Sequence, residues 1–451
     1  MKIVFYGVMT AIALSCNVQA AAIDFSEAWY QVAQKNDALQ AKKEEVKHSE
    51  ALQDAAKSLY LPNVDITGSY THFDKPVEID TSGVGAALPI PLPITLPNLP
   101  LTNQNFAHSS LNAVLPVYTG GRITAAQDIR QAQVDEAQSN YNLATRATFT
   151  QLVQYYFGVV LAEQVYQVRL DAVDALADHL SHAIKLEQQG QIAKVERLMA
   201  QVSLDKAQIE AQKSLRDYEI AKLALTKMLK QQDSVLPTTP LFVNNSATSV
   251  TPYLAKTLTD HPGIAILNAK REQAKGMVDM ASAKHLPEVM VYGNYNLYSD
   301  DSVTGELLPE WMVGVGVRIP IIERSGTSQE VVAAKSSVRQ VNLLQMQMQQ
   351  DLSILVEKTY AEMSQALEEY NSLASSQALS EETVILRQKA FSQGLSTSLE
   401  VADAQLYVTS IRVQRLSASY HYVKSLAQLL SVSGDIERFM DYLQINGIEV
   451  K

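Results

Sequence analysis

The sequence predicts a mainly α-helical chain that carries four β-strands of membrane type and is built from two tandem repeats. Three observations lead to this fold class. Short motifs return along the 451 residues at fixed offsets, the 15 prolines avoid two very long stretches, and four segments alternate apolar with polar residues. Repetition indicates two copies of one structural unit, proline-free stretches permit long helices, and alternation indicates strands.

Two sets of motifs return at different offsets. Residues 58–66 resemble residues 283–291, which lie 225 positions later. The second set returns after 204 positions and consists of a Gln-Gly pair followed by a glutamate: Gln189, Gly190 and Glu196, then Gln393, Gly394 and Glu400. A loop at 76–100 that contains six prolines explains the smaller second offset, since it enlarges the first half only. The predicted organisation is a first repeat, a linker, a second repeat and a tail: residues 21–233, 234–251, 252–433 and 434–451.

Proline placement predicts two unusually long helices. No proline occurs in residues 117–236 or 321–451, and an interior proline costs a helix roughly 3 kcal/mol. We therefore expect helices at 122–188 and 327–393, each roughly 100 Å long at the usual rise per residue.

Shorter helices provide partners for the long ones. Segments 22–58 and 396–430 together match one long helix in length, and segments 194–231 and 253–284 match the other. The last helix has apolar residues at alternating spacings of three and four, which is typical of a coiled-coil seam: Leu399, Ala402, Leu406, Thr409, Val413, Leu416, Tyr420, Val423, Ala427 and Leu430. One buried stripe of an ordinary bundle would give the same spacing, but the matched lengths favour a wall of antiparallel helices.

Four segments have the period of two that is typical of a half-buried strand: 63–71, 111–117, 289–297 and 311–319. Each approaches the length of a tilted membrane strand. A soluble four-stranded sheet is the alternative. Membrane barrels begin at eight strands, and an open edge in lipid leaves backbone groups unpaired, so membrane strands would require further copies of the chain.

Charge and cysteine content exclude several classes of function. The chain has 48 acidic and 37 basic residues and a formal charge of −11, which argues against a nucleic-acid partner. Its single cysteine, Cys16, permits no intrachain disulfide and no cysteine-rich metal site. Glycine-rich phosphate loops and nucleophile elbows are absent from the sequence, so we expect neither an enzyme nor a cofactor.

The first 20 residues are typical of an export signal. Lys2 precedes an apolar run at 3–14 that is too short to span a bilayer, and small residues at 18–20 suit a cleavage site. Acylation of Cys16 is the alternative, although the leucine usual three positions before such a cysteine is missing. After residue 22 no apolar stretch is long enough for a membrane helix.

In combination, these features resemble the TolC-like outer-membrane efflux family over essentially the whole mature chain. The motifs that carry the resemblance are the strand starts, the run after the second strand and the two helical turns: Leu61-Pro62, Leu286-Pro287, residues 116–122, Gly190 and Gly394. The resemblance implies a homotrimer with a twelve-stranded transmembrane β-barrel continuous with an α-helical coiled-coil barrel. It also implies an exit duct in the outer membrane of a Gram-negative bacterium, in contact with outer-membrane lipid. The duct would serve tripartite efflux or type I secretion with a periplasmic adaptor and an inner-membrane transporter.

The resemblance assigns functional residues to two turns, which we call the first tip (residues 189–196) and the second tip (residues 393–400). Glu400 and Asp403 would form carboxylate rings at a periplasmic aperture that favours cations and binds divalent ions. Without the resemblance they would be ordinary solvated helix residues. The tips themselves would dock the adaptor, through Gly190, Gln191, Gly394 and Leu395.

The sequence departs from the family at the residues that close the aperture. Where the best-known member of the family has a tyrosine and an arginine, this chain has Phe391 and Ser396, and Glu196 corresponds to their acidic partner. Phe391 cannot donate a hydrogen bond and Ser396 has no charge, so the same closing network cannot form. Closure must rely on packing and other contacts, or opening is easier.

Two rival functions remain at this stage. The first is a periplasmic coiled-coil scaffold or adaptor with a soluble sheet. The second is a metal-dependent hydrolase built on His179 and His182 with the nearby aspartates. Because no third histidine completes a site, we expect these residues to form a solvated helix face.

Overall fold

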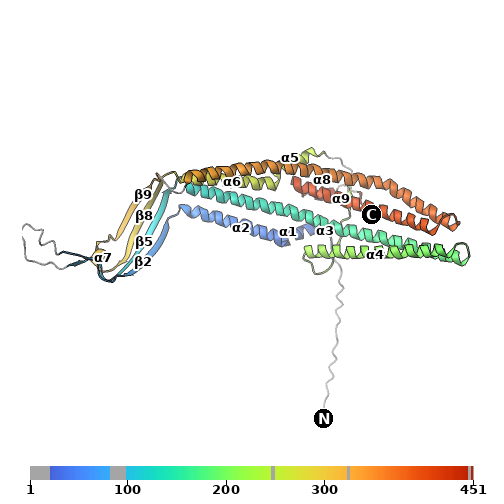
Figure 1. Cartoon of the computed structure of the whole chain (residues 1–451), viewed down its shortest axis with the longest axis horizontal. Coiled ribbons are helices and arrows are strands. Elements are labelled where there is room, and N and C mark those ends of the chain that lie inside the picture. The colour runs from blue at the N-terminus through green and yellow to red at the C-terminus, as the bar shows by residue number, and fades with distance from the viewer. Residues whose placement is uncertain (1–20, 82–97, 245–248, 322–325, 445–447, 450–451) are drawn as a thin grey trace, which may run out of the picture. The chain divides into compact units, whose positions relative to one another are not determined.

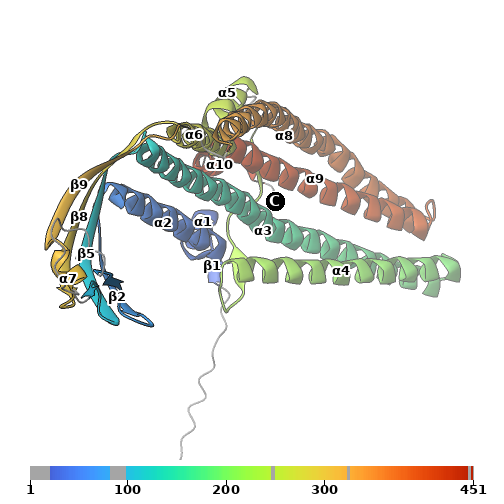
Figure 2. The ribbon, with the colours of Figure 1, turned by 60° about the vertical axis from the view of Figure 1, so that its left-hand side comes forward.

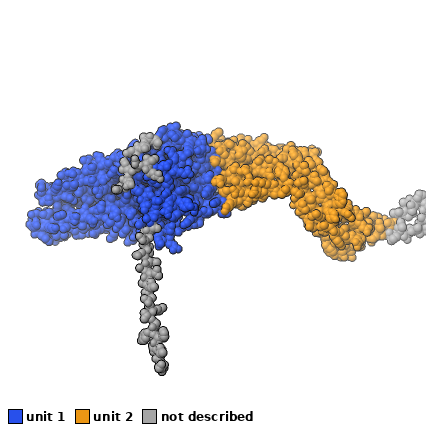
Figure 3. Space-filling view, turned by 180° about the vertical axis from the view of Figure 1, so that it is seen from behind, with its two compact units in different colours: residues 1–44, 139–264, 347–451 blue, residues 45–138, 265–346 orange. Residues whose placement is uncertain are grey.

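The computed structural model describes residues 21–81, 98–244, 249–321, 326–444 and 448–449 and is mainly helical (Figure 1). The expected export signal, including Cys16, and most of the loop at 76–100 lie outside the described residues. The described chain separates into two compact units (Figure 3). Unit 1 comprises residues 1–44, 139–264 and 347–451, and unit 2 comprises residues 45–138 and 265–346. Each unit contains parts of both predicted repeats, whose boundaries stay a prediction.

The two long helices occur where the sequence predicts them. Helix α3 is Arg122–Gln188 and helix α8 is Thr327–Ser392. The shorter partners are α4 (Lys194–Met228) and α9 (Ser398–Ser433). No helix among the described residues is long and apolar enough to cross a membrane.

Two of the predicted short helices are interrupted. Residues 22–58 form a strand β1 (Ala21–Ile23), helices α1 (Phe25–Lys35) and α2 (Asp37–Lys57), and a short η1 turn (Ser58–Tyr60). Asn36 ends α1 in an extended conformation, and its side chain accepts a hydrogen bond from the Leu39 N–H in the first turn of α2. Residues 253–284 divide into α5 (Thr251–Asp260) and α6 (Pro262–Ala283), because the residue before a proline is pushed out of helical conformation.

Unit 2 contains a four-stranded antiparallel sheet in the order β2-β5-β8-β9 (Figure 1). Its strands are β2 (Asn63–His72), β5 (Asn105–Tyr118), β8 (Glu288–Ser299) and β9 (Trp311–Arg318), so all four predicted strands form. Short strands β3 (Glu78–Ile79) and β4 (Leu99–Pro100) pair separately, and a one-turn helix α7 (Val303–Leu307) precedes β9.

Strand register brings the four predicted apolar faces onto one side of the sheet. One row of cross-strand partners runs from Ile66 to Leu111, Tyr295 and Trp311. The adjacent row, on the other face, is polar on three strands and ends at Met312 of β9. In it Asn112 donates to Asp65 Oδ2 at 3.2 Å, and Asn294 donates to Asn112 Oδ1 at 2.8 Å. The sheet therefore has one apolar and one polar face.

Unit 1 contains the ends of two helical hairpins, α3–α4 and α8–α9, whose turns lie at the same end (Figure 2). The turns have the same geometry. Gly190 and Gly394 have φ values of 74° and 71°, a conformation that glycine adopts without strain. The next residues, Gln191 and Leu395, donate their N–H groups to carbonyls five residues earlier at 2.9 Å, as in a Schellman motif. Both tips therefore reverse the chain with the same glycine-based turn.

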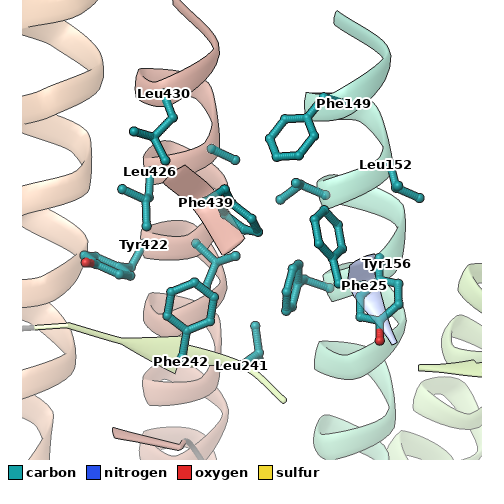
Figure 4. Packing of buried hydrophobic residues seen from close by; sticks show 14 of the residues in the cluster. Phe25, Phe149, Leu152, Tyr156, Leu241, Phe242, Tyr422, Leu426, Leu430 and Phe439 are labelled. Atoms are coloured by element: carbon teal, nitrogen blue, oxygen red, sulfur yellow. The ribbon is translucent and has the colours of Figure 1, made fainter. Parts of the chain in front are cut away.

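An aromatic core joins the N-terminal segment, linker and tail of unit 1 to its long helices. Phe25, Phe242 and Phe439 lie between α3 and α9 (Figure 4). Phe25 is fully buried, and its ring centroid is 5.3 Å from that of Tyr156. The Tyr156 hydroxyl donates to the Ile23 carbonyl at 2.8 Å and accepts from two backbone N–H groups of the linker.

The linker and tail also add short strands to this region. Strand β6 (Val235–Pro237) pairs with β1, and β7 (Phe242–Val243) pairs with β10 (Ile448–Glu449). The tail further contributes α10 (Arg438–Gln444). The described parts of the linker and the tail, residues 234–244 and 434–444, therefore contribute to the packing of unit 1.

Candidate functional site at the hairpin tips

The tips are held together by a second apolar cluster, to which all four hairpin helices contribute. Phe391 of α8 is 3% exposed and belongs to this cluster together with Leu176, Leu204 and Val401. Its ring lies against the imidazole of His179 on α3, with centroids 4.6 Å apart. Phe391, which has no hydroxyl to donate, thus makes a buried contact between the two hairpins.

His179 does not lie on a solvated face, contrary to the sequence prediction. It is 5% exposed, and its Nε2 is 3.2 Å from the Ser398 hydroxyl at the start of α9. Burial, with the nearby charge of His182, lowers the pKa of His179 to about 4, while the Glu196 carboxylate acts in the opposite direction. The imidazole is therefore neutral at pH 7.

Helical periodicity contained a signal for this burial. His179 lies three residues after Leu176 and four before Ala183, on the stripe that packs against α9 and α4. The aspartates at 171, 174 and 178 and His182 lie on the exposed face of α3. No group of three or more potential metal ligands is brought together among the described residues, so the structure gives no support to the hydrolase alternative.

Glu196 connects the two hairpins through the backbone. Its Oε2 accepts a hydrogen bond from the N–H of Ser398 at 2.6 Å. Ser398 is the first residue of α9, so a carboxylate from α4 satisfies one of the unpaired N–H groups at this helix start. The predicted acidic partner thus contacts the opposite hairpin, but at a main-chain donor.

Glu400 and Ser396 lie in the cap of the same helix. Thr397 and Glu400 form a capping box: the Thr397 hydroxyl accepts from the Glu400 N–H, and Glu400 Oε2 accepts from the Thr397 N–H at 2.9 Å. The Ser396 hydroxyl donates to the same carboxylate at 2.7 Å, and Arg387 forms an ion pair with it at 3.1 Å. The Thr397 N–H, the Ser396 hydroxyl and the charge of Arg387 lower the pKa of Glu400. This carboxylate is therefore kept ionised in a single chain.

The remaining predicted site residues are at the surface. Asp403 is exposed one turn beyond Glu400, and Gly190, Gln191 and Gly394 are exposed in the two turns. Leu395 is 76% exposed, a large apolar side chain at the end of the second tip. The structure thus brings Phe391, Ser396, Glu196 and Glu400 together around the start of α9. Sequence reasoning missed His179, Ser398 and Arg387 as members of this site.

Comparisons with known proteins agree with these features. The family model described as outer membrane efflux protein matches residues 28–230 and 254–435. Over 344 residues the chain is 22% identical to the outer membrane protein TolC of Vibrio cholerae, covering 72% of this chain and 76% of that protein. Over 260 residues it is 24% identical to the protein CyaE of Bordetella pertussis, covering 55% and 54%.

Solved channel structures share the fold. CusC matches with a TM-score of 0.76 at 14% identity, over 92% of this chain and 93% of that chain. The outer-membrane channel OprN matches with a TM-score of 0.74 at 14% identity, over 91% and 89%. The CmeC outer membrane channel of Campylobacter jejuni matches with a TM-score of 0.70 at 15% identity, over 93% and 89%. At these identities the likeness establishes the fold, whereas the family model covers most of the sequence. The chain therefore belongs to the outer membrane efflux protein family, which consists of TolC-like channels and not of enzymes.

Proposed function

We propose that three copies of this chain assemble into a channel-tunnel in the outer membrane of a Gram-negative bacterium. The tunnel acts as the exit duct of a tripartite efflux or type I secretion system. An inner-membrane transporter supplies the energy, a periplasmic adaptor docks on the two tips, and this chain provides the path. The observation that carries the proposal is the four-stranded sheet, whose apolar face and two edges are uncovered in a single chain.

The sheet's apolar face supports contact with lipid. Val313 and Val315 of the edge strand β9 are 68% and 66% exposed, and Ile66 of the other edge strand β2 is 68% exposed. Such a contiguous apolar surface is unfavourable in water and favourable against hydrocarbon. A soluble scaffold would have to cover this face, and nothing in the described part of the chain does so.

The sheet's edges support assembly. Among the described strands, β2 and β9 each have a hydrogen-bonded neighbour on one side only. Pairing β9 of one copy with β2 of the next is a head-to-tail contact that repeats until the ring closes. Three copies of four strands give twelve, a permitted number for a closed membrane barrel, and closure removes every edge.

The helices of unit 1 also carry uncovered apolar residues. Helix α4 has exposed apolar residues at spacings of three, four, seven, eleven and three, which are compatible with one stripe of a coiled coil: Val195, Leu198, Val202, Ile209, Ile220 and Leu223. On α8, Leu379 and Leu386 are exposed at a spacing of seven. Helices of neighbouring copies would cover these stripes, so that the helical wall closes together with the barrel.

Native mass measurement tests the assembly. We expect the protein to fractionate with the outer membrane, to require detergent, and to have the mass of three chains of about 50 kDa. Release by osmotic shock as a detergent-free monomer would contradict the proposal and favour the periplasmic scaffold.

The proposed aperture is tested by removing its charge while keeping its shape. Glu400→Gln with Asp403→Asn leaves an oxygen acceptor for the Thr397 N–H, so the cap of α9 is retained. At low salt we expect the cation preference of single channels in planar bilayers to fall roughly tenfold, because rings of carboxylates concentrate cations. Block by divalent cations should weaken in parallel.

A matched control removes two acidic charges elsewhere. Asp205→Asn with Glu210→Gln changes exposed residues of α4 outside the tips and should leave ion preference near the wild-type value. Equal ion preference in wild type and in the Glu400→Gln, Asp403→Asn variant would show that the aperture is formed by other residues.

A further inference from the structure

Two glycines of the edge strand β9 form a recess on the polar face of the sheet. Tyr292 of β8 lies opposite Gly314 in register, and Met290 lies opposite Gly316. A Cβ atom on Gly314 would be only 2.6 Å from Cζ and 2.7 Å from Oη of Tyr292. These are atoms at the far end of the phenol, so the side chain of Tyr292 reaches across to the Gly314 position. A Cβ on Gly316 would be 3.7 Å from Cε1 of the same ring.

This orientation is not the usual one for a strand residue. Side chains in a sheet normally stand roughly perpendicular to it. The absence of a side chain at Gly314 lets the ring lean along the sheet instead, as aromatic residues do across edge glycines. Any L-residue at 314 would meet the ring, and the ring would then have to rotate away from β9.

The ring lies on the face that would line the duct. Tyr292 is two residues from Asn294, whose amide donates to Asn112 in the polar row of the sheet. Gly293 lies on the other, apolar face, opposite Val313. A ring displaced from the recess would therefore move into the aqueous lumen.

We propose that Gly314, with Gly316, leaves room for the Tyr292 ring to lie against strand β9. The two glycines thereby set the free cross-section of the duct at this level. The inference rests on the proposed function, since it needs the polar face to be the lumen face. Three copies would carry three such rings. Tyr292 is the residue whose ring would narrow the barrel at this level, and Gly314 is the positioning residue that keeps the ring out of the path. The two glycines thus keep the barrel wide at this level.

Gly314→Ala tests the inference with the addition of a single methyl group. One methyl group per chain is too small to narrow a twelve-stranded duct by itself, so an effect requires movement of the ring. We expect single-channel conductance to fall by roughly tens of per cent and the largest permeating neutral polymer to become smaller. Gly316→Ala should have a weaker effect on the ring, because its methyl group would be 3.7 Å from Cε1 of Tyr292, whereas its tighter contact, at 3.3 Å, is with Cγ of Met290. Gly314→Ala combined with Tyr292→Ala should restore conductance to at least the wild-type value.

A matched control adds the same methyl group to the other face. A Cβ on Gly293 would be 3.5 Å from the nearest atom, the Met312 carbonyl oxygen, so Gly293→Ala should fold and conduct normally. A second readout does not require a channel: nitration of Tyr292, followed by mass spectrometry of its peptide, should be faster in the Gly314→Ala trimer.

The outcomes separate this inference from the proposed function. Unchanged conductance and unchanged Tyr292 nitration in a Gly314→Ala trimer would contradict the inference that Gly314 holds the ring against β9. Faster nitration with unchanged conductance would show that the ring moves but does not limit the path, which also overturns the inference. A wild-type protein that never conducts would refute the duct and, with it, the role given to Tyr292.

Discussion

Replacing Phe391 by alanine is expected to loosen the hairpin tips by about 3–4 kcal/mol, because a large buried ring is lost and the cluster around it can collapse only in part. Phe391 joins α8 to α3 through His179 and is 3% exposed. Backbone hydrogen exchange in the first turn of α9 should accelerate, and reconstituted channels should show a higher open probability. This result would support closure of the tips by packing in this chain.

Leu395→Ala is the matched control, since it removes an apolar side chain from the same tip at a position that is 76% exposed. Its effect on exchange in α9 should be small, because little buried surface is lost. If Phe391→Ala exchanges and conducts like wild type, closure does not depend on this cluster.

Lowering the pH from 7 to 4 is expected to destabilise the packing of the hairpins around His179 and Phe391 by up to about 3 kcal/mol. The pKa of His179 is lowered from 6.5 to about 4. Above pH 6.5 the imidazole is neutral in both the folded and the unfolded state, so its full contribution is present. Below pH 6.5 the unfolded state takes up a proton first, and stability falls until the folded pKa is reached. As the pH falls from 6.5 to 4, backbone hydrogen exchange at the tips and the open probability of the channel should therefore both increase.

His179→Gln should abolish this pH response, because glutamine can still hydrogen-bond to the Ser398 hydroxyl but does not titrate in this range. A control is needed for His261, whose pKa is also lowered to about 4 by burial and by the charge of Arg146. His261 lies at the junction of α5 and α6, so His261→Asn should leave the response at the tips unchanged. A response that persists in His179→Gln would show that His179 is not its source.

The regular elements were predictable because their signals are long and repeated. Helix α3 lies within a long proline-free stretch, and all four sheet strands follow from alternation over seven or more residues. The interruption at Asn36 was missed because no glycine or proline marks it. Its signal is the pair Asn36-Asp37, a capping residue and an acidic first-turn residue within an apparently continuous helix.

The site was predictable only in part. The resemblance placed Glu196, Phe391, Ser396 and Glu400 near two turns, and the structure places these four residues around the start of α9. The resemblance did not reveal what each side chain contacts. Glu196 contacts a main-chain N–H, and His179 is buried in part by residues more than 200 positions away in the sequence. Such contacts depend on tertiary packing. The pattern of apolar residues on a helix indicates which face is buried but not which residues that face contacts. The roles given to the aperture and the tips remain predictions.

The hydrogen bond from the Ser398 N–H to Glu196 has a consequence for movement. Because the carboxylate comes from α4, the Ser398 N–H in the first turn of α9 is capped only while the hairpins touch. When they separate, one backbone donor is left to water and the terminal turn becomes prone to unwinding. Dilation of the tunnel and fraying of this helix end would then occur together. Re-forming the first turn of α9 would favour the return of the tips to contact.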